Sequence, residues 1–127
     1  MFKRYFTGLQ HIGIPTKDME KTIAFYTGLG FTQTFRLQEG GLNVVFLESH
    51  GLVIEAYAGD ATESTGAIDH IALNVTDIEA VFQAVKENGY KLIDSQQIVT
   101  LPFFANGCSF FLIEGPNKER IEFNQIL

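Results

Sequence analysis

The sequence predicts an α+β fold in which two βαβββ modules form a curved mixed sheet around a concave cavity. The main observation is an internal repeat, in which residues 11–31 align without a gap with residues 70–90 and His11 meets His70. The second observation is that strand-like alternation follows a helix-like segment in each half. Together they indicate one structural unit that is used twice.

Each module is expected to begin with a short strand that carries the histidine and leads into a helix. In the second module, apolar residues recur at helical spacing: Ile78, Val81, Phe82 and Val85. Asp18 is suited to cap the first helix, and Thr76 with Glu79 has the spacing of a capping box. Glycines mark the expected helix ends: Gly28, Gly30 and Gly89.

After each helix the pattern predicts three strands. They are expected near residues 31–37, 42–48 and 52–57, and near residues 90–98, 109–114 and 120–125. The polar segment 59–66 is the expected linker. The sequence thus predicts one domain, 1–127, with a first module at about 7–58 and a second at about 67–127.

Composition narrows the classes of partner. Apolar residues make up 46% of the 127 residues, and the net charge is −6. This argues against nucleic acid and anionic membranes, which both attract clustered Lys and Arg. No apolar run reaches the roughly 20 residues of a spanning helix, and residues 1–6 do not resemble a signal peptide. Cys108 is the only cysteine, which favours a reducing cytoplasm.

Four side chains are candidates for a shared metal site. His11 and His70 open the two modules, while Glu55 and Glu122 each lie within an apolar segment that ends its module. Because side chains alternate along a strand, all four are expected on the face turned away from the helices. Carboxylates inside a sheet need a cation. Two imidazoles and two carboxylates suit a divalent first-row metal.

Aromatic residues are the second group of candidates. The chain has twelve Phe and no Trp. A substrate pocket could be formed by Tyr57, Phe103, Phe104 and Phe111. The alternative for each of them is ordinary packing in the core.

With these residues the chain resembles the vicinal oxygen chelate superfamily, which includes glyoxalase I, epimerases, extradiol dioxygenases, and fosfomycin and bleomycin resistance proteins. The resemblance runs from Leu9 to Gln125. Its carriers are the segments at 9–14 (LQHIGI), 25–31 (FYTGLGF), 68–72 (IDHIA) and 113–123 (IEGPNKERIEF).

The resemblance implies a metal quartet of His11, Glu55, His70 and Glu122, as in the bacterial glyoxalase I branch. The implied metal is nickel, cobalt or zinc, with manganese or iron as further options. The implied activity is that of a lyase or isomerase that stabilises an enediolate of a small-molecule substrate. By resemblance, Glu122 is the first candidate for the proton shuttle and Glu55 the second. Homodimers are expected, with each site formed by one chain or by two.

The chain also departs from the glyoxalase I pattern. Pro15 and Gly59 stand where residues that bind glutathione are expected, and the segment 101–106 carries no basic residue. The alternatives are therefore an epimerase, a fosfomycin-type thiol transferase, a dioxygenase, or a resistance protein that binds a drug without chemistry.

Overall fold

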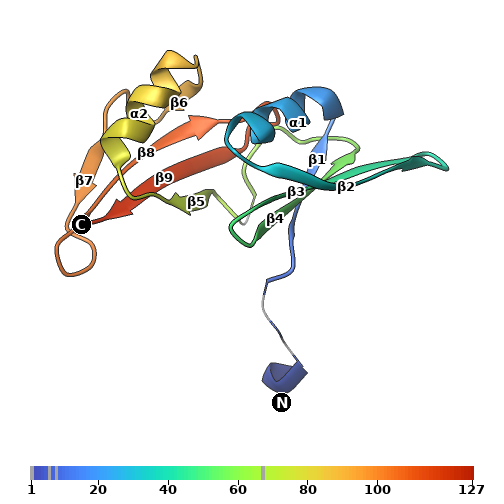
Figure 1. Ribbon diagram of the computed structural model, residues 1–127, viewed down its shortest axis with the longest axis horizontal. Coiled ribbons are helices and arrows are strands. Elements are labelled where there is room, and N and C mark those ends of the chain that lie inside the picture. The colour runs from blue at the N-terminus through green and yellow to red at the C-terminus, as the bar shows by residue number, and fades with distance from the viewer. Residues whose placement is uncertain (1, 6, 8, 67) are drawn as a thin grey trace. The chain divides into compact units, whose positions relative to one another are not determined.

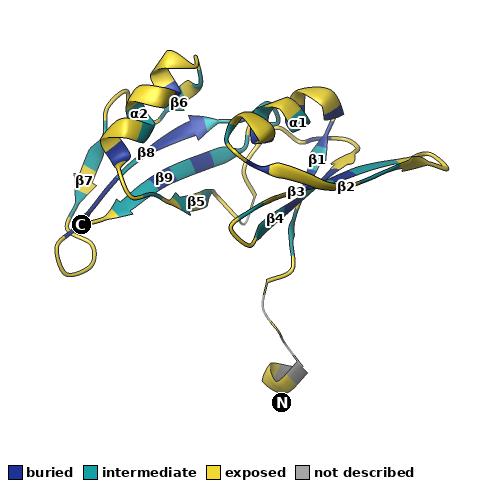
Figure 2. Cartoon of the chain, viewed as in Figure 1, coloured by how far each residue is buried: buried dark blue, intermediate teal, exposed yellow. Residues whose placement is uncertain are grey.

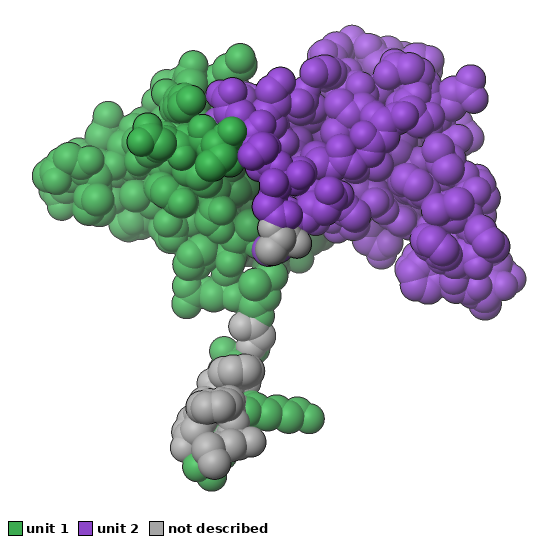
Figure 3. Space-filling view, turned by 180° about the vertical axis from the view of Figure 1, so that it is seen from behind, with its two compact units in different colours: residues 1–62 green, residues 63–127 purple. Residues whose placement is uncertain are grey.

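The repeat in the sequence appears as two compact units, residues 1–62 (unit 1) and 63–127 (unit 2), coloured separately in Figure 3. The computed structural model describes residues 2–5, 7, 9–66 and 68–127. Four residues lie outside the described part: Met1 and Phe6 of the N-terminal stretch, Gly8 of the first predicted module, and Ala67, which begins the second.

The described part of unit 1 contains one α-helix and a four-stranded sheet (Figure 1). Its elements are a 3₁₀ turn η1 (Phe2–Tyr5), β1 (Ile12–Thr16), α1 (Met19–Gly28), β2 (Thr32–Glu39), β3 (Leu42–Ser49) and β4 (Leu52–Ala58). The strand order is β1-β4-β3-β2. The first and last strands, β1 and β4, are neighbours and run parallel, while the other pairs are antiparallel.

Unit 2 repeats this arrangement with one additional strand. Its elements are β5 (Ile71–Asn74), α2 (Ile78–Glu87), β6 (Lys91–Ile93), β7 (Val99–Leu101), β8 (Cys108–Glu114) and β9 (Arg120–Ile126). The strand order is β5-β9-β8-β6, and β7 also pairs with β8. Strands β5 and β9 are parallel neighbours, as β1 and β4 are. The α+β class and the repeated module order are confirmed, with a mixed sheet in each unit.

The two helices begin in the same way. The carboxylate of Asp18 accepts a hydrogen bond from the backbone N–H of Lys21, and that of Asp77 accepts one from Ala80, each at 3.0 Å. Asp18 is therefore the cap that we expected, whereas the second cap is Asp77 and not Thr76. Asp77 is also the residue that aligns with Asp18 in the repeat, so the repeat predicts the second cap correctly. Among the described residues, no helix is long and apolar enough to cross a membrane.

The core of each unit lies between its helix and one face of its sheet. Ile54 and Ala56 flank Glu55 in β4 and are buried, and Ile121 and Phe123 do the same around Glu122 in β9. Figure 2 shows this burial along β8 and β9. Because side chains alternate along a strand, each glutamate must point to the face opposite the core.

One predicted strand is wrong. The segment 90–98 was expected to be a single strand, but β6 ends at Ile93 because Asp94 adopts a positive φ of 65° and turns the chain. The chain then forms β7, which we did not expect, and continues into the loop 102–107. An aspartate tolerates the left-handed region better than the β-branched residues around it.

Candidate metal centre

The first candidate pair is formed by two neighbouring strands of unit 1. His11 lies directly before β1, and Glu55 lies in β4, which runs parallel to β1 with Gly13 opposite Glu55. The ring Nε2 of His11 is 3.1 Å from Oε2 of Glu55. The other ring nitrogen, Nδ1, is 2.8 Å from the side-chain oxygen of Gln10. Both side chains are partly exposed, His11 at 32% and Glu55 at 26%.

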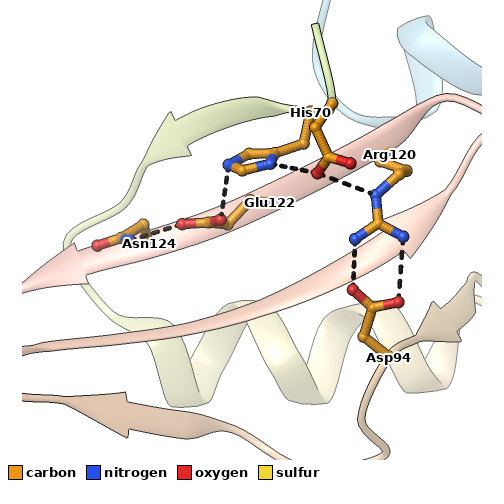
Figure 4. Close-up of polar contacts among 6 residues, drawn as sticks. His70, Asp94, Arg120, Glu122 and Asn124 are labelled. Carbon is orange, nitrogen blue, oxygen red and sulfur yellow. Dashed lines mark hydrogen bonds and ion pairs between the residues drawn. The ribbon is translucent and has the colours of Figure 1, made fainter. Parts of the chain in front are cut away.

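The second pair repeats this geometry in unit 2. His70 lies directly before β5, and Glu122 lies in β9 opposite Ala72. The distance from Nε2 of His70 to Oε2 of Glu122 is again 3.1 Å. In this unit the ring Nδ1–H donates to a carboxylate, because Oδ2 of Asp69 lies 2.8 Å away. Figure 4 shows the ring of His70 beside the carboxylate of Glu122.

The two glutamates differ in their further contacts. Oε1 of Glu122 accepts a hydrogen bond of 2.7 Å from the side-chain amide of Asn124, and the Glu122 side chain is only 12% exposed. Tyr57 occupies the corresponding position in β4, two residues after Glu55. Its ring lies against the backbone at Gly13, where an added Cβ would be 3.5 Å from the ring. The surroundings of Glu55 are therefore more apolar.

An ion network continues from His70. Arg120 donates from Nε to Oδ2 of Asp69 at 3.3 Å and binds both carboxylate oxygens of Asp94, one of them at 3.1 Å. The hydrogen bond from His70, with help from the charge of Arg120, lowers the pKa of Asp69. The hydrogen bonds from Arg120 likewise lower the pKa of Asp94, and Asp94 raises that of Arg120.

The donor atoms of each pair are suited to a cation. In a neutral imidazole one nitrogen donates and the other accepts a hydrogen bond. Where Nδ1–H of His70 donates to Asp69, the lone pair of Nε2 faces the carboxylate of Glu122. Two such atoms 3.1 Å apart are held favourably only with a proton or a cation beside them. Imidazole and carboxylate are both ligands of divalent first-row metals, so the residues fit the expected metal.

The four residues predicted as metal ligands are thus brought together as two pairs, one in each unit. Within the described part of the chain, no three side chains of His, Cys, Asp and Glu form a metal site by themselves. The third histidine, His50, lies in the turn after β3 at a positive φ of 51° and contacts Ser49.

The predicted pocket aromatics lie in different environments. Phe111 is 1% exposed and packs between Phe82 of α2 and Phe123, so it belongs to the core on the helix side of the sheet rather than to a pocket beside Glu122. Phe103 and Phe104 are exposed on the loop after β7. Phe104 contributes to the wall of a hollow of about 480 Å³ that this loop forms with the end of β7.

Tyr57 lies beside two uncharged residues in unit 1, Pro15 and Gly59. It is paired with Pro15 in the parallel register of β1 and β4, and a Cβ added at Gly59 would lie within about 4 Å of both side chains. Pro15 and Gly59 stand at the two positions where glutathione-binding residues were expected. Neither residue carries a cationic or amide side chain that could bind the charged ends of glutathione.

Four residues around the second pair were not predicted from the sequence: Asp69, Asp94, Arg120 and Asn124. Three of them could have been found from the sequence, because Asp69 directly precedes His70, and Arg120 and Asn124 alternate onto the same face as Glu122. Asp94 could not, since 26 residues separate it from Arg120 along the chain.

Comparison with known proteins gives a consistent picture. The sequence model of the glyoxalase/bleomycin resistance protein/dioxygenase superfamily matches residues 8–123. The uncharacterized protein YwbC of Bacillus subtilis (strain 168) is 32% identical over 126 residues, which cover 92% of this chain and 96% of that protein.

Solved structures share the fold. A glyoxalase family protein from Enterococcus faecalis has a TM-score of 0.77 at 19% identity, covering 94% of this chain and 98% of that one. The fosfomycin resistance protein FosX from Listeria monocytogenes, solved with Mn(II) and a sulfate ion, has a TM-score of 0.75 at 18% identity. That match covers 96% of this chain and 94% of FosX.

Proposed function

Because this chain belongs to the glyoxalase/bleomycin resistance protein/dioxygenase superfamily, we propose that it is a divalent-metal-dependent enzyme related to glyoxalase I. It acts as a lyase or isomerase on a small substrate. The observation that carries the proposal is the repeated pair, in which an imidazole Nε2 lies 3.1 Å from a carboxylate oxygen in both units. A drug-binding module without chemistry has no need of these pairs.

In this proposal four residues hold the metal, two from each unit: His11, Glu55, His70 and Glu122. Nickel, cobalt or zinc is the expected ion, and the Mn(II) in the FosX structure adds manganese to the metals worth testing. When bound, a divalent ion supplies Lewis acidity to two neighbouring oxygens of a substrate.

The chain itself supplies the proton transfer. Glu122 is the first candidate to take a proton from a carbon beside a carbonyl group and to return it to the neighbouring atom, and Glu55 is the second. The hydrogen bond from Asn124 holds Oε1 of Glu122, which leaves Oε2 as the oxygen on the His70 side for this role. The uncharged residues Pro15, Tyr57 and Gly59 support a substrate that is smaller or more apolar than a glutathione conjugate.

The first experiment measures metal content. The purified protein is loaded with nickel, cobalt, zinc or manganese, and bound metal is quantified for the wild type, His70→Ala and Glu122→Gln. We expect stoichiometric metal in the wild type and a large loss in both variants. His50→Ala is the matched control, because His50 lies in the turn between β3 and β4, where its ring contacts Ser49, and the substitution should not change the metal content. A wild-type protein that never exceeds trace metal contradicts the proposal.

The second experiment identifies the reaction. The metal-loaded protein is screened against 2-oxoaldehydes, each alone and with several thiols. Turnover that depends on metal and is lost in Glu122→Gln supports the glyoxalase-like reaction, and turnover without glutathione supports the role given to Pro15 and Gly59. Transfer of a thiol to an epoxide would instead favour the FosX-like alternative. Oxygen consumption with iron would favour a dioxygenase.

A third experiment identifies which chains supply the quartet. His11→Ala and His70→Ala are each purified, mixed and re-equilibrated. If one site uses residues from two copies of the chain, the mixture regains metal binding, because one combination of units carries both histidines. If each chain forms its own site, the mixture remains as deficient as its components.

A further inference from the structure

The residue that precedes each metal-candidate histidine differs between the units. In unit 1 it is Gln10, whose neutral side-chain oxygen faces Nδ1 of His11. In unit 2 it is Asp69, whose Oδ2 faces both Nδ1 of His70 at 2.8 Å and Nε of Arg120 at 3.3 Å. A carboxylate is the stronger acceptor and fixes which ring nitrogen carries the proton.

Asp69 is itself held in place by Arg120. The guanidinium group of Arg120 binds Asp94 with both terminal nitrogens, as the parallel dashed lines in Figure 4 show. This bidentate contact is the more directional form of an ion pair. The positive φ that ends β6 brings Asp94 into this position. The chain of contacts Asp94–Arg120–Asp69–His70 therefore joins the turn after β6, the start of β9 and the residues before β5.

The described residues at the corresponding positions of unit 1 form no equivalent chain of contacts. Val53 stands two residues before Glu55, where Arg120 stands before Glu122. An ion pair elsewhere in unit 1 joins Arg36 of β2 to Glu20 of α1 at 2.7 Å. That pair involves neither His11 nor Glu55, so it serves as an internal control for a salt bridge with a purely structural role.

We propose that Asp69 is a positioning residue for His70, and that Arg120, anchored on Asp94, fixes Asp69 in that role. This inference rests on the proposed metal-binding function and deepens it. The His70–Glu122 pair is the pre-organised half of the metal site: Asp69 holds the proton on Nδ1, which leaves Nε2 of His70 free as a ligand, and Asn124 orients Glu122. The His11–Glu55 pair is the more adaptable half.

The first test needs no metal. Long-range ¹H–¹⁵N spectra of the metal-free protein report which ring nitrogen of each histidine carries a proton. We expect a proton on Nδ1 of His70 in the wild type and a shift toward Nε2–H in Asp69→Ala. Asp69→Asn, which keeps an acceptor oxygen, should restore part of the wild-type signal. Gln10→Ala is the matched control and should leave the signals of His70 unchanged.

The second test measures metal affinity by competition with a chromophoric chelator. Loss of a carboxylate that orients a ligand histidine weakens metal binding by about 10- to 100-fold, and we expect Asp69→Ala to fall in this range. Arg120→Gln should weaken binding less than Asp69→Ala, because Asp69 remains but loses its anchor. Arg36→Gln, which removes the control ion pair, should leave the affinity unchanged.

The outcomes separate this inference from the proposed function. If the wild type takes up no metal, the proposed function fails, while the spectra still decide whether Asp69 positions His70. Identical His70 signals in the wild type and Asp69→Ala would overturn the positioning role. A changed signal with unchanged metal affinity would overturn the claim that this chain of contacts pre-organises the site. Circular dichroism of each variant confirms that the fold is retained.

Discussion

Unit 1 and unit 2 present the same pair of side chains on the same pair of parallel strands, but they surround it with different chemistry. In unit 1 the face that carries His11 and Glu55 continues into Gly13, Pro15 and Tyr57. In unit 2, by contrast, the corresponding face contains Ala72, Asn74 and Asn124, with the ion network of Asp69 and Arg120 at its edge.

The comparison distinguishes what the repeated backbone contributes to each pair from what the neighbouring side chains contribute. The backbone repeat determines that a histidine and a glutamate meet, because parallel neighbours keep a fixed register. The residues beside them determine how firmly each pair is held and what else can bind there. Four variants or pairs of variants test this division, from the largest expected effect to the smallest.

Matched substitutions in the core test whether the scaffolds are equivalent. Ile54 and Ile121 each precede the glutamate of their unit and are 1% exposed. Replacing either by alanine should cost about 2–5 kcal/mol of unfolding free energy, through lost burial and the cavity that remains. Urea denaturation of both variants checks this. Similar losses of unfolding free energy in both variants support equivalent scaffolds. A loss below about 1 kcal/mol in one unit would show that the two cores do not support their sheets equally.

Substitutions beside the glutamates test the difference in polar support. Asn124→Leu removes the amide that donates to Glu122 and should cost about 1–3 kcal/mol, because a poorly exposed carboxylate loses a hydrogen bond. Tyr57→Leu, the matched change in unit 1, removes no hydrogen bond to Glu55 and should cost less. Denaturation of the metal-free proteins gives both values. An equal or larger loss in Tyr57→Leu would contradict the contrast.

The helix caps give a smaller effect that should be the same in both units. Asp18→Ala and Asp77→Ala each remove a hydrogen bond of 3.0 Å to the first turn of a helix. Each should cost about 1 kcal/mol. Thr76→Ala is the control, since Thr76 is not the cap, and it should have little effect. Thermal denaturation compares the three variants, and a larger loss for Thr76 than for Asp77 would refute the assigned cap.

The smallest effect concerns acid stability in unit 2. Lys91 binds the carboxylate of Glu114, which lowers the pKa of Glu114 from its ordinary value of 4.5. A lowered pKa in the folded state stabilises the protein above pH 4.5, and this contribution is lost as the pH falls through the folded value. Glu114→Gln should therefore cost less than about 1 kcal/mol at pH 7.

The same variant should also lose less stability than the wild type between pH 7 and pH 3. Urea denaturation across this range measures the difference, and Lys91→Met removes the same contact from the other side. If the unfolding free energy of Glu114→Gln fell more steeply with decreasing pH than that of the wild type, the assigned role of Glu114 would be contradicted.

Much of the fold was accessible from sequence because it depends on local patterns. The helical spacing of Ile78 and Val85 and the alternation around Glu55 are properties of a few consecutive residues. The positions of the two histidines followed from the repeat. The prediction failed where a single residue changed the backbone direction, at Asp94, and where two neighbouring acceptors competed as caps, at Thr76 and Asp77.

The sequence by itself predicted the two histidines, the two glutamates and the face of the sheet on which they lie, since alternation and a repeated register need no knowledge of distant contacts. Only the tertiary structure decided what supports each pair. Arg120 reaches Asp94 and Asp69 across 26 and 51 residues of chain. Such contacts depend on how strands pair and where turns place their ends, and no local pattern encodes that. Likewise, only the tertiary structure shows that Phe111 packs against Phe82 of α2 and therefore belongs to the core.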